Sequence, residues 1–142
     1  MNINVLRDFR TNFRGLRSWG ARVISSDPAW RYVSVRRLFN YVEKSMDIGL
    51  QWVVFEPNDP NLWAQVERTI SDFLTLVWRS GALFGSTAEE AFYVKCDSTT
   101  MSVQDIEAGR FIAEVGICPV RPAEFVVIRV SQWQGGSAVE EG

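Results

Sequence analysis

The sequence predicts an α/β (α+β) domain in which two main helices pack on a mixed β-sheet that ends in a C-terminal antiparallel pair of strands. Three observations support this class: two long segments have apolar residues at helical spacing, several short apolar runs lie between turn signals, and the last two runs flank a proline-rich turn. A chain of 142 residues fits one compact domain. We expect the domain to span residues 1–134, followed by a flexible tail of small and acidic residues from Gly135 to Gly142.

The first clear helix is expected from Val35 to Ile48. Ser34 is a suitable N-cap, because its hydroxyl can accept a hydrogen bond from a free amide of the first turn, and Gly49 can end the helix. One apolar stripe runs along this segment and consists of Val35, Leu38, Phe39, Val42 and Met46. The stripe indicates a helix with one buried face.

A continuous apolar run from Leu50 to Phe55 follows this helix, and Glu56 and Pro57 stop it. Apolar runs without alternation are typical of strands that are covered on both faces. We therefore expect Trp52, Val53, Val54 and Phe55 to lie in the core.

The second helix is expected from Pro60 to about Ser80. Asp59 is a good N-cap, and proline is favoured at the first helical position because its missing N–H has no partner there anyway. The apolar stripe consists of Trp63, Val66, Ile70, Phe73, Leu74 and Val77, and Leu62, Leu76 and Trp78 widen it. A helix this apolar is expected to be covered on more than one side.

Shorter elements fill the rest of the chain. Five strands are expected, at Asn2 to Leu6, Leu16 to Ile24, Ala91 to Cys96, Arg110 to Cys118 and Glu124 to Trp133. Gly20 marks a bulge or a close backbone approach. Capping-box spacing from Thr87 to Glu90 and from Ser102 to Asp105 predicts two short helices. The last two strands are expected to pair across the turn, with Phe111, Ala113, Val115 and Ile117 on one face of the first of them.

Charge is unevenly distributed along the chain. Residues 1–40 carry eight Arg against Asp8 and Asp27, a formal +6, whereas residues 41–142 carry −8. This asymmetry can steer copies of the chain head to tail, or it can belong to a solvated surface with local ion pairs. A pI of about 5.2 and the lack of a long Lys/Arg run argue against nucleic acid as a partner.

The usual signs of catalysis are missing from the sequence. It has no histidine, no glycine-rich phosphate loop, and two cysteines, Cys96 and Cys118, without close spacing. We expect both cysteines to be buried free thiols and expect no metal, no cofactor and no enzymatic activity. The first residues lack a basic patch before an apolar run, and no apolar stretch reaches about 20 residues. A cytosolic product without membrane insertion is therefore expected.

Six stretches together resemble the C-terminal region of contractile phage tail sheath proteins, including the related sheaths of contractile injection systems. They are INVLRDF (3–9), GLRSWGARVISSDPAWRYVSVRRL (15–38), QWVVFEPND (51–59), FLTLVWRSGALFG (73–85), EEAFYVKCD (89–97) and RPAEFVVIRVSQW (121–133). No single stretch is diagnostic, so the specificity of the resemblance comes from their order and spacing. Family members are usually several times longer, and the chain can correspond to a fragment, a split gene product or a minimal sheath.

The resemblance implies a structural subunit that assembles as stacked hexameric rings around an inner tube and contracts to drive that tube through a target envelope. It implies homo-oligomeric contacts, an inner tube protein and a baseplate as partners, assembly in the bacterial cytoplasm, and a final place in a virion tail or injection-system particle. In this family, strands are exchanged between subunits, which is a form of β-augmentation. The residues expected at the subunit interface are Ile3, Val5, Phe125, Val127, Arg129 and Trp133.

The sequence also allows other roles for these residues and for the whole chain. The last strand can be an ordinary internal strand instead of an exchanged one. Arg36 and Arg37 can face the tube, or they can be solvated or paired within the chain. A baseplate or tail-terminator module that does not contract is an alternative function, and a small enzyme or ligand-binding domain is a more distant one.

Overall fold

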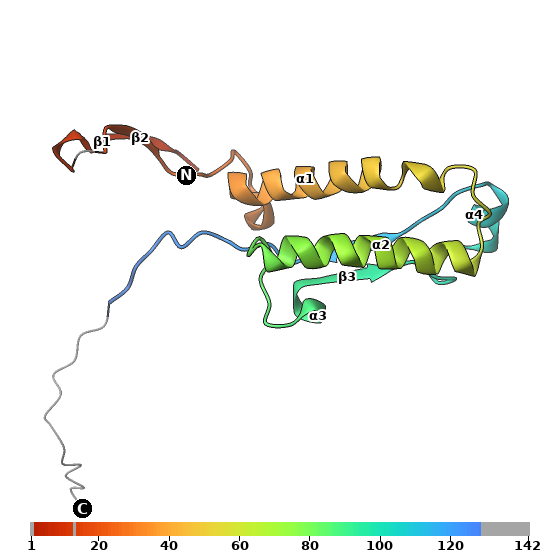
Figure 1. Cartoon of the computed structure of the whole chain (residues 1–142). Helices are drawn as coiled ribbons and strands as arrows, with labels where there is room; N and C mark the ends of the chain where they lie inside the picture. Colours follow the sequence, from red (N-terminus) through yellow and green to blue (C-terminus); the bar gives the residue numbers. More distant parts are fainter. Residues whose placement is uncertain (1, 13, 129–142) are drawn as a thin grey trace, which may run out of the picture.

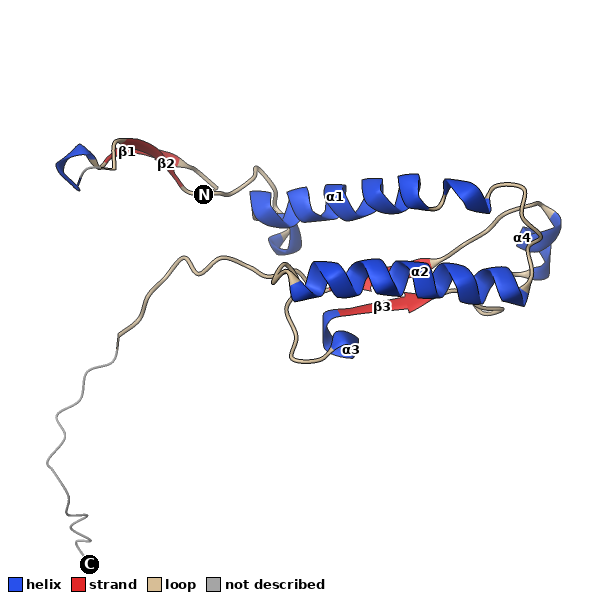
Figure 2. Cartoon of the chain, viewed as in Figure 1, coloured by secondary structure: helices blue, strands red, loops and turns tan. Residues whose placement is uncertain are grey.

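The computed structural model describes residues 2–12 and 14–128 of the chain. Two long helices, α1 (Val33–Gly49) and α2 (Pro60–Arg79), run side by side in opposite directions along the length of the body (Figure 1). The short helices α3 (Ala88–Ala91) and α4 (Val103–Glu107) lie toward opposite ends of α2. Figure 2 shows the hairpin of β1 (Val5–Asp8) and β2 (Leu16–Trp19) projecting from one end of the body.

The strands form two separate antiparallel pairs among the described residues. β1 pairs with β2, and β3 (Phe92–Lys95) pairs with β4 (Glu114–Ile117), with Val94 opposite Val115. Helices and small antiparallel sheets make the fold α+β, which confirms the predicted class. The expected pairing of residues 110–118 with residues 124–133 is wrong over the described part, because β4 takes β3 as its partner and residues 121–128 form no strand.

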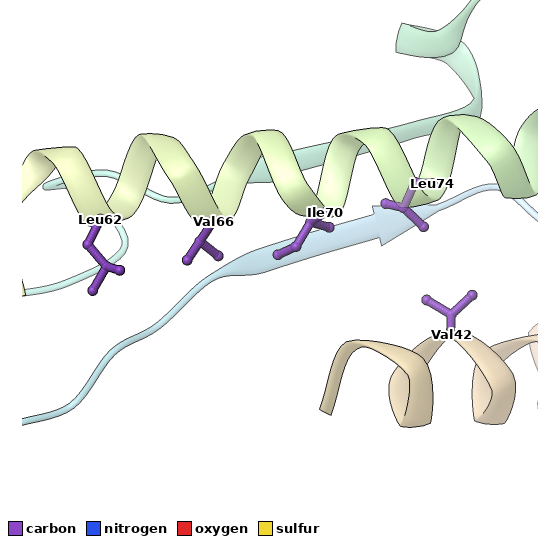
Figure 3. Packing of buried hydrophobic residues seen from close by; sticks show 5 residues of the cluster. All are labelled: Val42, Leu62, Val66, Ile70 and Leu74. Carbon is purple, nitrogen blue, oxygen red and sulfur yellow. The ribbon is translucent and has the colours of Figure 1, made fainter. Parts of the chain in front are cut away.

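Helix α2 supplies more of the buried core than any other element, and its start agrees with the sequence-based prediction. The Asp59 side chain accepts a hydrogen bond of 2.8 Å from the Leu62 N–H, with Pro60 at the first helical position. Four buried side chains follow at every fourth residue, and they point to the side of α2 on which Val42 of α1 projects toward them (Figure 3). They are Leu62, Val66, Ile70 and Leu74. Burying side chains of this kind contributes about 1.5–3 kcal/mol each, so this row is a large apolar contribution from a single element.

Helix α1 begins two residues earlier than predicted, and Ser34 is not its cap. Tyr32 occupies the N-cap position without a side-chain hydrogen bond. The Val33 N–H instead donates to the Ala21 carbonyl at 2.9 Å, next to an isolated antiparallel bridge between Arg22 and Tyr32. A distant backbone segment therefore satisfies the amide that a local cap would otherwise have to satisfy.

The prediction that residues 50–55 form a buried strand is wrong. Residues Gln51–Val53 form a 3-10 turn, and Val53 packs against the core while Val54 is 63% exposed and Phe55 fully exposed. Trp52 is also exposed, at 38%. The reason is that α1 and α2 run in opposite directions, so the chain must reverse its direction in the link between them. The amides of this link form local hydrogen bonds, such as the one from the Val53 N–H to the Leu50 carbonyl.

The β3–β4 region agrees with the alternation in the sequence. Phe111, Ala113, Val115 and Ile117 all pack against the core cluster. The predicted capping box is present in α4, where the Asp105 N–H donates to Ser102 Oγ and the Ser102 N–H donates to Asp105 Oδ2. Thr87 makes no side-chain cap to α3; the Ser86 N–H donates instead to Glu90 Oε2 at 2.8 Å.

The N-terminal hairpin is shorter than its two predicted strands. β2 ends at Trp19 because Gly20 has a φ of 141°, which side-chain-bearing residues rarely adopt. A Cβ placed on Gly20 would lie 2.7 Å from Asn4 Oδ1, so the close approach predicted at this glycine is confirmed. The rings of Phe9 and Trp19 pack against each other in a tilted arrangement, with ring centroids 4.7 Å apart.

After β4, the backbone bonds to the body at Pro119 and Val120 and then extends away from it. Pro119 forms a bridge with Leu83, and the Val120 N–H donates to the Ala82 carbonyl at 3.1 Å. From there the segment leaves at the end of the body that carries the hairpin (Figure 1). The predicted strand residues 129–133, the domain boundary at 134 and the predicted tail lie outside the described residues. Within the described part of the chain, no helix is long and apolar enough to cross a membrane.

Candidate assembly interface

The hairpin β1–β2 exposes every one of its side chains. All four residues of each strand are exposed, including Leu6 at 80% and Leu16 at 68%. A two-stranded hairpin alone is at best marginally stable in water, because its backbone groups on both outer edges are open to solvent and it has no core of its own. Since neither strand pairs with any other described strand, both edges can accept a further strand.

The second part of the candidate interface is the apolar segment Phe125–Ile128, which leaves the body at the end that carries the hairpin (Figure 1). Its four residues are 78–84% exposed and make no ladder with any described strand. Four consecutive β-branched or aromatic residues have high strand propensity, and leaving them in water is unfavourable. Within the described residues, one molecule thus has a hairpin with open edges and a strand-forming segment that belongs to no ladder.

Arg22 and Glu124 join these two parts. Arg22 Nε donates to Glu124 Oε1 at 2.8 Å, and the second guanidinium nitrogen donates to Oε2, so the pair is bidentate. Side-chain exposure is 23% for Arg22 and 24% for Glu124. The hydrogen bonds from Arg22 lower the pKa of the Glu124 carboxyl, and Tyr32 adds a smaller effect in the same direction. Beside the pair lies a cleft of about 540 Å³ that Asn4, Trp19 and Phe125 help to line.

The described residues that were predicted at the interface lie in these two parts. Ile3 is 64% exposed just before β1, and Val5 lies in β1 opposite Trp19. Phe125 and Val127 lie in the apolar segment, where both are exposed. Two further predicted residues, Arg129 and Trp133, lie outside the described residues.

Arg36 and Arg37 are exposed near the start of α1. The Arg36 guanidinium lies over the Trp30 ring, 3.8 Å from its centroid, which is a cation–π contact within the chain. Arg37 lines a shallow groove with Tyr41, Val120 and Arg121. The exposed positions leave both side chains accessible to a partner surface.

The two thiols differ in exposure and reactivity. Cys96 is buried, and burial, with Glu67 and Asp97 nearby, raises the pKa of its thiol to about 11, so it is not a thiolate at neutral pH. Cys118 is exposed, which corrects the prediction that both thiols are buried; it follows Ile117 at the end of β4, where the alternating side chains turn outward. Within residues 2–12 and 14–128, no three His, Cys, Asp or Glu side chains group as metal ligands would.

Sequence reasoning did not find the Arg22–Glu124 pair. The two residues are 102 positions apart and belong to different stretches of the family resemblance, and neither stretch indicates a pairing between them. A weak signal was present at Glu124, because it is a single charge between the turn residues and an otherwise apolar strand-like run. Only the fold shows which of the many Arg residues meets it.

Comparison with known proteins decides the family. The model of the family described as phage tail sheath C-terminal domain matches residues 25–132. The chain belongs to this family. The match confirms the resemblance inferred from the order of the six sequence stretches. It contains α1, α2, both strands of the β3–β4 sheet and the apolar segment.

Individual sheath proteins agree with the family match. A tail sheath protein of Vibrio phage KVP40 is 26% identical over 100 residues, which is 70% of this chain and 14% of that protein. The PVC sheath complex of an extracellular contractile injection system, in its contracted state, contains a chain that is 40% identical, with a TM-score of 0.85 over 92% of this chain. The contracted helical sheath of the anti-feeding prophage (AFP) gives 43% identity and a TM-score of 0.83.

A chain of the AFP baseplate is similar to the same degree, with 42% identity and a TM-score of 0.84. This sheath-family domain covers 36–37% of these solved chains and a smaller part of the phage relative. It therefore spans little more than a third of the structures it matches.

Proposed function

We propose that this chain is the C-terminal assembly domain of a contractile sheath subunit. In this proposal, copies stack as hexameric rings around an inner tube, and the sheath contracts to drive that tube through a target envelope. The observation that carries the proposal is the incomplete β-structure at one end of the molecule: an open hairpin and an unpaired apolar segment emerge together. Support comes from the 40–43% identity to chains of sheaths in the contracted state.

The assembly step is strand exchange between copies. The segment Phe125–Ile128, with the residues after it, adds to an open edge of the β1–β2 hairpin of a neighbouring copy. Main-chain hydrogen bonds of the added strand supply affinity, and its alternating side chains set the register. Because donor and acceptor are different surfaces, each copy binds one neighbour and is bound by another, which propagates rings or helices instead of closed pairs.

Contraction in this proposal needs no nucleotide and no catalytic group. The energy is stored in how the subunits pack, and the exchanged strands keep them connected while they rotate. Arg36 and Arg37 on α1 are the residues that we assign to contact with the inner tube, because they are exposed and carry positive charge at the basic end of the chain. Assembly takes place in the bacterial cytoplasm, and the product is a virion tail or an injection-system particle attached to a baseplate.

A second candidate function is a baseplate or tail-terminator module that binds the end of a sheath without contracting. The likeness to a chain of the AFP baseplate favours it, since that likeness is as strong as the likeness to the sheath chains. The two functions differ in what the chain forms: a sheath subunit elongates into tubes, whereas an end module stops at rings.

Negative-stain electron microscopy of the purified chain tests both candidates. A synthetic peptide with residues 121–134 serves as a competitor for the hairpin edge, and the same peptide with V127P serves as its control, because proline removes a ladder N–H. We expect the purified chain to form tubes or rings. These assemblies should disappear when the 121–134 peptide is added and persist when its V127P version is added. Monodisperse particles that bind neither peptide would contradict the proposal, and rings that never elongate would favour the end module.

A further inference from the structure

The bidentate ion pair between Arg22 and Glu124 is unlike the other exposed ion pairs of the described residues. Lys44 and Asp47, three residues apart on α1, form a single contact at 71% and 66% side-chain exposure. Pairs of that kind contribute little to stability, because water and salt screen them. The Arg22–Glu124 pair has two parallel hydrogen bonds, less than a quarter of each side chain exposed, and 102 positions between its members.

Arg22 is held in place from several sides. Its N–H donates to Asn4 Oδ1 at 2.9 Å, and Asn4 Nδ2 donates back to the Arg22 carbonyl at 2.8 Å. The bridge between Arg22 and Tyr32 connects the same residue to the start of α1. The guanidinium therefore projects from a fixed backbone at the base of the hairpin.

Glu124, in contrast, belongs to a segment with few other attachments. Up to residue 128, the last backbone hydrogen bond of this segment to the body is the one from the Val120 N–H to the Ala82 carbonyl, and Pro122 has no N–H to donate. Beyond Glu124, the described residues Phe125–Ile128 are exposed. The ion pair is thus the final attachment before the apolar segment begins.

We propose that the Arg22–Glu124 pair is a clamp that fixes where and in which direction the apolar segment leaves the molecule. This inference rests on the proposed strand exchange and concerns its control. The clamp holds the start of the donor segment against the base of the same copy's acceptor hairpin. A neighbour consequently meets a strand of defined register instead of a tether that pivots at Pro122, and less conformational entropy is lost on assembly.

Spin labelling of the chain at a concentration where it is monomeric tests the clamp directly. Labels are attached at I48C, on the far end of α1, and at V126C, both exposed sites, in a C118S background. Cys96 stays unlabelled because it is buried and its thiol pKa is raised to about 11. We expect a narrow distribution of distances between the two labels in this chain and a broad one in E124Q. The control is E114Q, in which the distribution should stay narrow; Glu114 is a surface carboxylate that accepts a hydrogen bond of 2.8 Å from the Tyr93 hydroxyl.

A double-mutant cycle checks that the pair, and not either residue alone, is responsible. R22Q and E124Q should each broaden the distribution, and R22Q/E124Q should broaden it no further than either single change. A distribution that stays narrow with E124Q overturns the clamp. Additive broadening in the double variant also overturns it, because the two residues would then act independently.

Assembly of the unlabelled variants separates the clamp from the proposed function. With E124Q or R22Q, we expect the concentration needed for assembly to rise about tenfold, as for loss of a charge-assisted hydrogen bond, and with E114Q to stay unchanged. Equal assembly of E124Q and the parent chain contradicts the role of the clamp even where the parent forms tubes. Failure of the parent chain itself to assemble contradicts the proposed function, while the label distances still decide whether the clamp exists.

Discussion

Trp63 and Asn58 are joined by a hydrogen bond in which the indole Nε1–H donates to Asn58 Oδ1 at 2.7 Å. The same Asn58 donates through Nδ2 to the Arg110 carbonyl at 3.1 Å. One amide side chain thus connects the first turn of α2 with the segment that leads into β4. No sequence pattern indicates that Trp63 and Arg110, the two hydrogen-bond partners of Asn58, lie close together.

Replacing Asn58 with alanine should lower the free energy of unfolding by about 1–3 kcal/mol, because it leaves the half-buried indole N–H of Trp63 without its acceptor. Urea unfolding followed by tryptophan fluorescence measures the change. Asn40, exposed on α1, is the matched control, and N40A should change stability by no more than about 0.5 kcal/mol. Equal effects of the two substitutions would show that the hydrogen bonds of Asn58 contribute nothing.

Leu74 is fully buried in α2 at the point where Val42 of α1 approaches it (Figure 3). L74A should destabilise the domain by about 2–5 kcal/mol, from lost apolar burial and from the cavity that remains. Leu76, two residues later on the same helix, is 66% exposed, so L76A should have a small effect in the same assay. A similar loss for both would mean that α2 buries a different face.

The helices and most of the inner faces could be predicted from sequence because their signals are local. The Asp59–Pro60 start, the row of apolar residues in α2 and the capping box at Ser102 each depend on neighbours within a few positions. The alternation from Phe111 to Ile117 was equally readable, since it needs only one covered face. These features agree with the structure for that reason.

Pairing and position of the remaining segments depend on distant residues, and there the prediction was wrong. The run from Leu50 to Phe55 has strand composition, but the reversal between α1 and α2 leaves it as an exposed link. Glu124 meets Arg22 across 102 positions, which no local pattern indicates. Apolar segments with no partner in the described residues are what an assembling subunit is expected to expose.

Phe55 combines full exposure with a left-handed backbone, at a φ of 72°. Because a residue with a side chain pays about 1–2 kcal/mol in this conformation and Phe55 buries nothing in return, F55G should stabilise the isolated domain by about 1 kcal/mol. Thermal unfolding measures the shift. Val54 has an ordinary extended backbone, with φ −65° and ψ 126°, so V54G should destabilise because glycine adds conformational entropy to the unfolded chain. Stabilisation by both substitutions would contradict the left-handed backbone of Phe55 as the cause.

Gly20, directly after β2, lies close to Asn4 and should tolerate no side chain. G20A places a methyl group 2.7 Å from Asn4 Oδ1 at a φ of 141°, so we expect the hairpin to open and the hydrogen bonds between Asn4 and Arg22 to break. Amide hydrogen exchange in residues 5–19 should become faster. Gly49, at the end of α1 with open space around it, is the control: G49A should leave hairpin exchange unchanged. Unchanged protection in G20A would contradict the close approach.

Acid should release the apolar segment. The hydrogen bonds from Arg22 lower the pKa of Glu124 below the usual 4.5, with smaller contributions of the same sign from Tyr32 and Arg31. Since the folded-state pKa is the lower one, the pair stabilises the structure fully above pH 4.5 and loses this contribution as the pH falls through the folded-state value. The label distance between positions 48 and 126 should therefore broaden only below pH 4.5 in the parent chain. In E124Q it should already be broad at pH 7 and lack this transition, and a parent distribution that broadens between pH 5 and 7 would assign the release to another group.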